Sequence, residues 1–266
     1  MPNTRAMTDV KIVPTQFESE GQLIKGDFVI PDRDGPFPGI CKFHGLPGGA
    51  DQVSGVASRL AESGYAVLAF DFRGFRRSEG LFSLEGEIQD ARNAVTHLLD
   101  SKFTIDDWSG VYGASYGGAV AICSAVRDKR TKVVCVRAPV YDTLWFAESP
   151  MIRSAVAEIL QVSPKEMHGL AEPATQKAML EKMIKDSRIY NPINEVNRLS
   201  PRPIFIVTGG ADKGIPVDGV RRLYDEAKRP KEFAVVEGAD HNLSNPEHYA
   251  MTCELVVSWF REAYPQ

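Results

Sequence analysis

The chain has 266 residues, a hydrophobic content of 43% and a formal net charge of −4 at pH 7. This length and composition fit one large α/β domain that can bury a sizeable core. The small negative charge, without a run of lysine and arginine, argues against nucleic acid as a partner. No stretch has the apolar length of a signal peptide or a membrane span, so we expect a soluble cytoplasmic protein with no membrane partner.

Short apolar runs alternate with helical patterns along the chain. We predict strands at residues 11–17, 23–30, 40–44, 65–70, 109–112, 132–137, 203–208 and 231–236, and helices at residues 52–63, 84–100, 116–127, 217–227 and 246–262. Strands separated by helices indicate a mostly parallel central sheet with helices on both faces. The first two runs have no helix between them, so they are expected to form an antiparallel edge.

The segment between residues 139 and 203 interrupts this alternation, because it is far longer than the roughly 2–6 residues usual for a loop in an α/β unit. The stretches SAVAEILQV and ATQKAMLEKMIKDSRIY have helical periodicity, and SPKEMHGL has the serine and proline of a helix start. We therefore predict one domain over residues 1–266 with a helical cap inserted at residues 141–199, called the cap segment below.

The cysteines Cys41, Cys123, Cys135 and Cys253 lie in apolar segments without C-x-x-C spacing, which favours buried reduced thiols. The histidines do not form a pair at zinc-ligand spacing with a third ligand nearby, so we expect no metal site.

The stretch VYGASYGG places Ser115 between glycines, directly after an apolar run and before a helical pattern. A serine hydroxyl needs an adjacent base and an exposed position to act as a nucleophile. The G-x-S-x-G pattern between a strand and a helix supplies that exposure through a sharp turn. On its own this pattern is weak, since it also matches ordinary turns.

Two further residues strengthen the interpretation. Asp212 follows the strand run PIFIVTGG, and His241 follows the next run, FAVVEGAD. Loops at the carboxyl ends of parallel strands converge on one crevice. We therefore expect Ser115, Asp212 and His241 to meet there, in the chain order serine, acid, histidine.

Upstream, the run KFHGLPGG ends a strand in a glycine-rich loop, which is suited to presenting backbone N–H groups to an oxyanion. We call residues 44–49 the glycine-rich loop. With this loop, DFRGFRRSEG at residues 71–80, the Ser115 turn and the Asp212 and His241 loops, the chain resembles the α/β-hydrolase superfamily. Within it the esterase, dienelactone-hydrolase-like and prolyl-oligopeptidase-like branches are the most similar. The resemblance spans nearly the whole chain outside the cap segment and the first twenty or so residues.

The resemblance implies a role for each matched residue. Ser115 would be the nucleophile, His241 the general base and Asp212 the acid that orients it. The backbone N–H groups of Leu46 and Tyr116 would bind the oxyanion, and no cofactor would be required.

Three residues leave alternatives open. The family pattern D-x-R-G-x-G-x-S has glycine where this chain has Arg76; a solvated loop arginine is the favoured interpretation, and a side chain directed towards the cap segment is the other. Asp142 is a rival for the acid, because some relatives draw the acid from that strand end. His44 is expected to hold the glycine-rich loop by hydrogen bonds rather than to act as a second base.

The cap segment also offers aromatic side chains for a substrate pocket, although aromatic residues in helices more often belong to the core. The candidates are Tyr141, Trp145, Phe146 and Tyr190.

We predict a serine carboxylesterase that cleaves small to medium carboxylic esters through an acyl-enzyme, with a small-molecule ester as its partner. The alternatives are an amidase or exopeptidase of the same fold and, in a different class, a non-catalytic binding protein.

Overall fold

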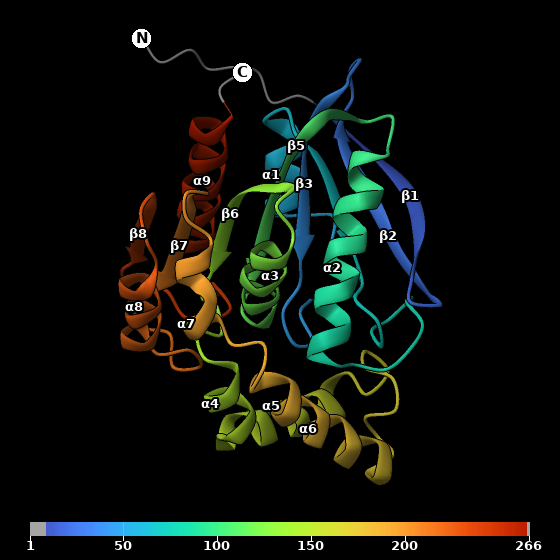
Figure 1. Cartoon of the computed structure of the whole chain (residues 1–266), viewed down its shortest axis with the longest axis vertical. Helices are drawn as coiled ribbons and strands as arrows, with labels where there is room; N and C mark the ends of the chain where they lie inside the picture. The colour runs from blue at the N-terminus through green and yellow to red at the C-terminus, as the bar shows by residue number, and fades with distance from the viewer. Residues whose placement is uncertain (1–8, 50, 265–266) are drawn as a thin grey trace.

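A computed structural model describes residues 9–49 and 51–264 of the chain. Its centre is an eight-stranded sheet in the order β1-β2-β4-β3-β5-β6-β7-β8 (Figure 1). The strands are β1 (Val10–Ser19), β2 (Gln22–Pro31), β3 (Phe37–Phe43), β4 (Ala66–Phe70), β5 (Thr104–Ala114), β6 (Thr131–Arg137), β7 (Ile204–Gly209) and β8 (Lys231–Val236).

Strand directions follow from the connections between the strands. The pairs from β4 through β3 and β5 to β8 are all parallel, whereas β1 pairs antiparallel with β2, and β2 pairs antiparallel with β4. This confirms the predicted mostly parallel sheet and its antiparallel edge. β4 and β7 are buried along their whole length, as their continuous apolar sequences require.

Helices cover both faces of the sheet. α1 (Val56–Glu62) and α9 (Pro246–Ala263) pack on one face, and α2 (Leu84–Leu99), α3 (Tyr116–Arg127) and α8 (Val217–Glu226) pack on the other (Figure 1). All four cysteines are buried free thiols, as predicted. Within the described ranges, none of the helices combines the length and apolarity needed to cross a bilayer.

The first helix begins later than the sequence pattern predicts. Residues 52–55 form a turn, in which the Asp51 carboxylate accepts hydrogen bonds from the N–H groups of Val53 and Ser54, both at 3.0 Å. Gly55 then has a φ of 64°, a left-handed conformation that a right-handed helix does not contain. The helix therefore begins only at Val56.

The cap segment contains α4 (Thr143–Glu148), α5 (Pro150–Val162), α6 (Pro173–Ser187), α7 (Pro192–Glu195) and the short 3-10 helix η1 (Val196–Arg198). In Figure 1, α4, α5 and α6 gather beyond the end of the sheet towards which β3 points. That end is where the carboxyl termini of the parallel strands lie.

The predicted helix start at residues 163–170 is wrong, because this stretch is an irregular turn. Besides short-range turn hydrogen bonds, its backbone pairs with the loop after β4. Met167 forms a bridge with Phe75, the His168 N–H donates to the Gly74 carbonyl at 2.8 Å, and the Arg76 N–H donates to the Glu166 carbonyl at 3.2 Å.

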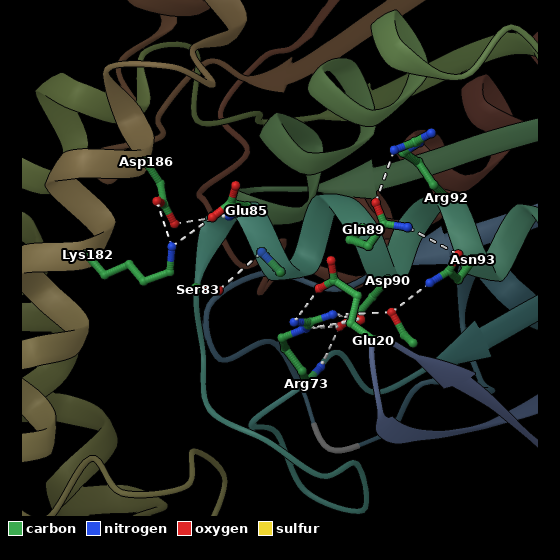
Figure 2. Close-up of polar contacts among 12 residues, drawn as sticks. Glu20, Arg73, Ser83, Glu85, Gln89, Asp90, Arg92, Asn93, Lys182 and Asp186 are labelled. Carbon is green, nitrogen blue, oxygen red and sulfur yellow. Dashed lines mark hydrogen bonds and ion pairs between the residues drawn. The ribbon is translucent and has the colours of Figure 1, made fainter.

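Ion pairs fasten α6 to the start of α2, as Figure 2 shows. The Lys182 ammonium lies 2.9 Å from the carboxylates of both Glu85 and Asp186. The Asp186 carboxylate also accepts a hydrogen bond from the Glu85 N–H at 3.2 Å. This end of α6 is thereby held against the first turn of α2.

A second ionic contact joins the loop after β4 to the middle of α2 (Figure 2). The Arg73 guanidinium contacts the Asp90 carboxylate at distances from 2.7 to 3.1 Å, and the Arg73 N–H donates to the same carboxylate at 3.0 Å. Asp90 is fully buried. Arg73 is therefore the cation that makes a charged Asp90 tolerable in the core.

We expect Arg73→Ala to lower the free energy of unfolding by about 3 kcal/mol, because it leaves a buried carboxylate without its partner. Urea unfolding monitored by circular dichroism measures this change. The control Lys177→Ala removes the exposed Lys177–Glu181 pair, 3.8 Å apart, and should cost less than about 0.5 kcal/mol. Equal losses in the two variants would contradict this account of Arg73.

Candidate active site

Ser115 occupies a strained turn between β5 and α3. Its φ of 54° and ψ of −119° lie in a region that residues with side chains rarely adopt. The turn is held by hydrogen bonds from the Ser115 N–H to the Arg137 carbonyl at 2.9 Å and from the Val140 N–H to the Ser115 carbonyl at 2.9 Å. Strain of this kind persists only where the surrounding structure enforces it.

The glycines around Ser115 are required by close backbone packing. A Cβ atom at Gly113 would lie 2.2 Å from the Gly117 carbonyl oxygen, and one at Gly117 would lie 2.3 Å from the His44 carbonyl oxygen. Any side chain at these positions would push the strand, the helix and the glycine-rich loop apart. The G-x-S-x-G pattern is therefore a steric requirement of this junction.

The structure brings Ser115, His241 and Asp212 together at the carboxyl ends of β5, β8 and β7. The His241 Nε2 lies 3.0 Å from the Ser115 Oγ, and the Nδ1 lies 2.7 Å from the Asp212 Oδ2. A carboxylate only accepts hydrogen bonds, so Nδ1 carries the proton and Nε2 is left free to accept the serine hydroxyl proton.

Both ends of this chain of hydrogen bonds are anchored. The Asp212 side chain is fully buried, and its Oδ1 accepts from the N–H groups of Gly214 and Ile215 at 2.8 Å each. The Arg137 guanidinium donates to the His241 carbonyl. Arg137 is a functional residue that was not predicted from the sequence, although one signal was available, namely a cation at the end of the apolar strand VVCVR.

His44 fixes one peptide of the glycine-rich loop. Its Nε2 accepts the Phe72 N–H at 3.0 Å, so Nδ1 carries the proton and donates to the Gly45 carbonyl at 2.8 Å. The Gly45–Leu46 peptide is trans, and its N–H therefore points away from the carbonyl that His44 holds. His44 thus holds the loop, in agreement with the favoured interpretation.

The two predicted oxyanion donors, the N–H groups of Leu46 and Tyr116, belong to the glycine-rich loop and to the start of α3. A Cβ atom at Gly45 would be 3.1 Å from the Ser115 Cβ, so the residue before Leu46 touches the serine. Tyr116 begins α3, where N–H groups have no partner within the helix. Among the described residues, neither the Leu46 N–H nor the Tyr116 N–H donates a hydrogen bond. Their role as donors stays a prediction.

Asp142 has a different task from Asp212. Its Oδ1 accepts the N–H groups of Leu144 and Trp145 at 3.0 Å and the Asn191 side-chain amide at 2.8 Å. It is the N-cap of α4, whereas Asp212 is the carboxylate that contacts His241.

The expectation of a solvated Arg76 is wrong, and the alternative direction, towards the cap segment, is the one observed. The side chain is only 8% exposed and its Nε lies 3.2 Å from the Glu166 Oε2. The guanidinium also donates to backbone carbonyls of the glycine-rich loop. These partners lie far from Arg76 in the sequence. The polarity of its side chain alone therefore led to the prediction of a solvated arginine.

The four candidate pocket residues divide by their contacts. The Phe146 ring lies 5.8 Å from the ring of Tyr116, the residue after Ser115. Tyr141 stacks on Trp145 at 5.0 Å and fits against Gly219, where a Cβ atom would lie 2.0 Å from its ring. The Tyr190 hydroxyl donates a hydrogen bond to the Glu85 carboxylate at 3.2 Å, and the Arg127 guanidinium lies over the Tyr190 ring. Pocket lining stays a prediction for all four.

The sheet, its flanking helices and the arrangement at its carboxyl edge define a hydrolase of the α/β-hydrolase fold. Residues 20–243 match the family described as X-Pro dipeptidyl-peptidase (S15 family), and the chain belongs to this family.

The individual proteins that resemble this chain share only low sequence identity with it. The uncharacterized protein YfhR of Escherichia coli is 26% identical, over 84% of this chain and 70% of that protein. The thiohydrolase aneE of Aspergillus aculeatus is 23% identical, over 84% of each chain. A solved Pyrococcus furiosus esterase, 20% identical, matches with a TM-score of 0.70 over 96% of this chain and 91% of that chain, which shows a shared fold.

The buried His44 predicts a pH dependence of stability. Burial, followed by the nearby Arg76 cation, holds the pKa of its imidazole well below the usual value. The unfolded chain therefore binds this proton more readily than the folded chain. Hence the contribution of His44 to stability is complete above pH 6.5 and is lost as the pH falls towards the folded-state pKa.

We expect the wild-type protein to lose about 1–2 kcal/mol through His44 between pH 7.5 and pH 5, a loss that His44→Gln should remove. Urea unfolding at a series of pH values measures this difference. The control His248→Gln removes another imidazole. An unchanged slope in His44→Gln would show that the buried imidazole is not responsible.

Proposed function

We propose that the protein is a serine hydrolase that cleaves small to medium carboxylic esters through an acyl-enzyme intermediate. The observation that carries this proposal is the continuous chain of hydrogen bonds from Asp212 through His241 to Ser115. A histidine held in one tautomer by a carboxylate, with its other nitrogen on a serine hydroxyl, activates that serine as a nucleophile.

In the proposed reaction the Ser115 Oγ attacks the ester carbonyl while the His241 Nε2 takes the hydroxyl proton. The N–H groups of Leu46 and Tyr116 bind the oxyanion of the tetrahedral intermediate. His241 then returns the proton to the leaving alcohol, and the acyl group stays on Ser115. Water, deprotonated by His241, attacks the acyl-enzyme, and His241 passes that proton to the departing Ser115 Oγ as the acid is released.

The charges of the cap segment favour an ester over a peptide. Binding the charged amino terminus of a peptide takes a carboxylate reserved for it. Asp142 caps α4, Glu166 pairs with Arg76, Asp186 pairs with Lys182, and Glu195 pairs with Arg127. The remaining carboxylates of the segment, Glu148, Glu158, Glu172 and Glu181, are exposed. An ester requires no such group.

The second candidate is an amidase or exopeptidase, which the family membership favours. Glu87 of α2 is the buried carboxyl group that comes nearest to the requirement, since it lies close to Tyr116 and is only 2% exposed. Burial, followed by the nearby Asp90, raises the pKa of Glu87 well above its usual value. Because burial disfavours the carboxylate form that would attract an ammonium group, we rank this candidate second. The names of the thiohydrolase and esterase relatives agree with that order.

The nucleophile is tested by covalent labelling. A fluorophosphonate should label the native protein once, at Ser115, and Ser115→Ala should abolish labelling and lower kcat by several powers of ten. Mass spectrometry of peptides locates the label, and circular dichroism confirms that the variant is folded. A label at another residue, or an unlabelled native protein, would overturn the assignment of Ser115.

The acid has a matched control in the same molecule. Asp212→Asn should lower kcat by about 10⁴, because an amide favours the wrong imidazole tautomer. Asp142→Asn should leave kcat within about twofold, because asparagine caps a helix as well as aspartate does. An exchange of these two outcomes would move the acid to the end of β6.

Substrate class is tested with paired leaving groups. We expect kcat/KM for p-nitrophenyl butyrate to exceed that for Gly-Pro p-nitroanilide by at least about a hundredfold. The reason is that the amide needs protonation of a poorer leaving group and also a binding site for its amine. Activated leaving groups enlarge this gap, so methyl butyrate and Gly-Pro amide should be compared as well. Faster turnover of Gly-Pro amide than of methyl butyrate would establish the peptidase.

A further inference from the structure

The guanidinium of Arg76 lies against the glycine-rich loop. Its Nη1 and Nη2 donate to the Pro47 carbonyl at 3.2 and 3.0 Å, and Nη2 also donates to the Gly49 carbonyl at 2.9 Å. The side chain is nearly buried. One cation therefore binds two carbonyl groups of the loop that is proposed to hold the oxyanion.

These contacts set the direction of peptide groups that follow Leu46 in the glycine-rich loop, whose first glycine, Gly45, lies beside Ser115. An oxyanion site needs N–H groups, and a peptide that flipped would present a carbonyl oxygen, with a dipole of the wrong sign, to the developing charge. His44 holds the Gly45 carbonyl. Arg76 holds the carbonyls of Pro47 and Gly49, so the two cover the loop between them. A positive charge close to these oxygens makes a flip still less favourable.

The backbone of Arg76 is strained in a way that glycine would avoid. Its φ of 47° is left-handed, and this is the position at which the family resemblance places glycine. Asp71 and Glu166 lie beside its Nε, at 3.3 and 3.2 Å, in ion-pair contact without hydrogen-bond geometry. An unfavourable backbone conformation is thus combined with a nearly buried cation directed at the loop.

The cap segment holds Arg76 from the other side. The Arg76 N–H donates to the Glu166 carbonyl at 3.2 Å, and the His168 Nε2 donates to the Arg76 carbonyl at 3.1 Å. With the Glu166 carboxylate on Nε, three contacts from one turn of the cap segment position this residue. Arg76 therefore lies between the cap segment and the glycine-rich loop.

We propose that Arg76 is a positioning residue that holds the glycine-rich loop ready for the oxyanion, and that the cap segment acts on the reaction through it. This inference rests on the proposed function of Ser115. Because Arg76 acts on the loop and not on the bound substrate, its loss should affect the transition state more than substrate binding.

The test uses Arg76→Gly, which suits the left-handed backbone while it removes every side-chain contact. With p-nitrophenyl butyrate, and with kcat expressed per fluorophosphonate-titrated site, we expect kcat to fall at least about tenfold and KM to change less than about twofold. Butylboronic acid forms a tetrahedral adduct with an active serine, and its Kd should rise by the same factor as kcat falls. Arg76→Lys, which keeps the strain and one cation, should lie between wild type and Arg76→Gly.

Arg77 provides a matched control. It contacts Asp71 at 2.8 Å and Asp27 at 2.9 Å, and none of its contacts reaches the glycine-rich loop. Arg77→Gln should therefore keep wild-type kcat and boronate affinity. A loss in Arg77→Gln equal to that in Arg76→Gly would assign the effect to Asp71 and overturn the proposal.

Two other results would also overturn it. Wild-type kcat and boronate affinity in Arg76→Gly would show that the loop does not depend on this cation, and a rise in KM alone would make Arg76 a binding residue. In both results the wild-type protein is active, so the proposed function stands. A wild-type protein inert to the ester and to the fluorophosphonate would overturn the proposed function and the role of Arg76 together.

Discussion

The site depends on the left-handed turn at Ser115. A serine at a φ of 54° costs about 1–3 kcal/mol, and the turn persists because three backbone segments close on it. Gly113 and Gly117 face one another across the turn, and Gly45 touches Ser115 itself. The same contacts that force the serine into this conformation bring the glycine-rich loop and the start of α3 beside its hydroxyl. Strain and alignment therefore have one cause.

Cations of the loop after β4 join that loop to α2, to the cap segment and to the glycine-rich loop. Arg73 joins the loop to α2 through a fully buried carboxylate, and Arg76 joins it to the cap segment and the glycine-rich loop. Lys182 joins α6 to α2 in a similar way. Each of these charges is compensated by its own partner, so none is left to hold a charged substrate. The carboxylates Asp90, Glu166 and Asp186 are in turn engaged by these cations, so none of the three is available to a peptide amine.

The parts that were predictable from the sequence depend on local pattern. The predicted strand 231–236 and helix 116–127 coincide with β8 and α3, because an apolar run and a glycine boundary are short-range features. Ser115, Asp212 and His241 each follow a strand, and the rule that parallel strands end at one edge was enough to bring them together. By contrast, the turn at residues 163–170 pairs with the distant Phe75, and no local pattern encodes that pairing.

Arg76 shows which signal a sequence offers for such long-range contacts. The charge of Arg76 led to the prediction of a solvent-exposed side chain. That prediction was wrong because the residues it contacts, Pro47 and Glu166, are distant in the chain. Its position carried better information. Where a motif requires a left-handed residue, glycine adopts the conformation without steric strain and most other residues are strained by about 1–2 kcal/mol, so a larger residue there needs contacts that offset the strain. Three hydrogen bonds and two ion pairs meet that requirement here. A departure from glycine at such a turn therefore points to a partner, whatever the polarity of the residue that replaces it.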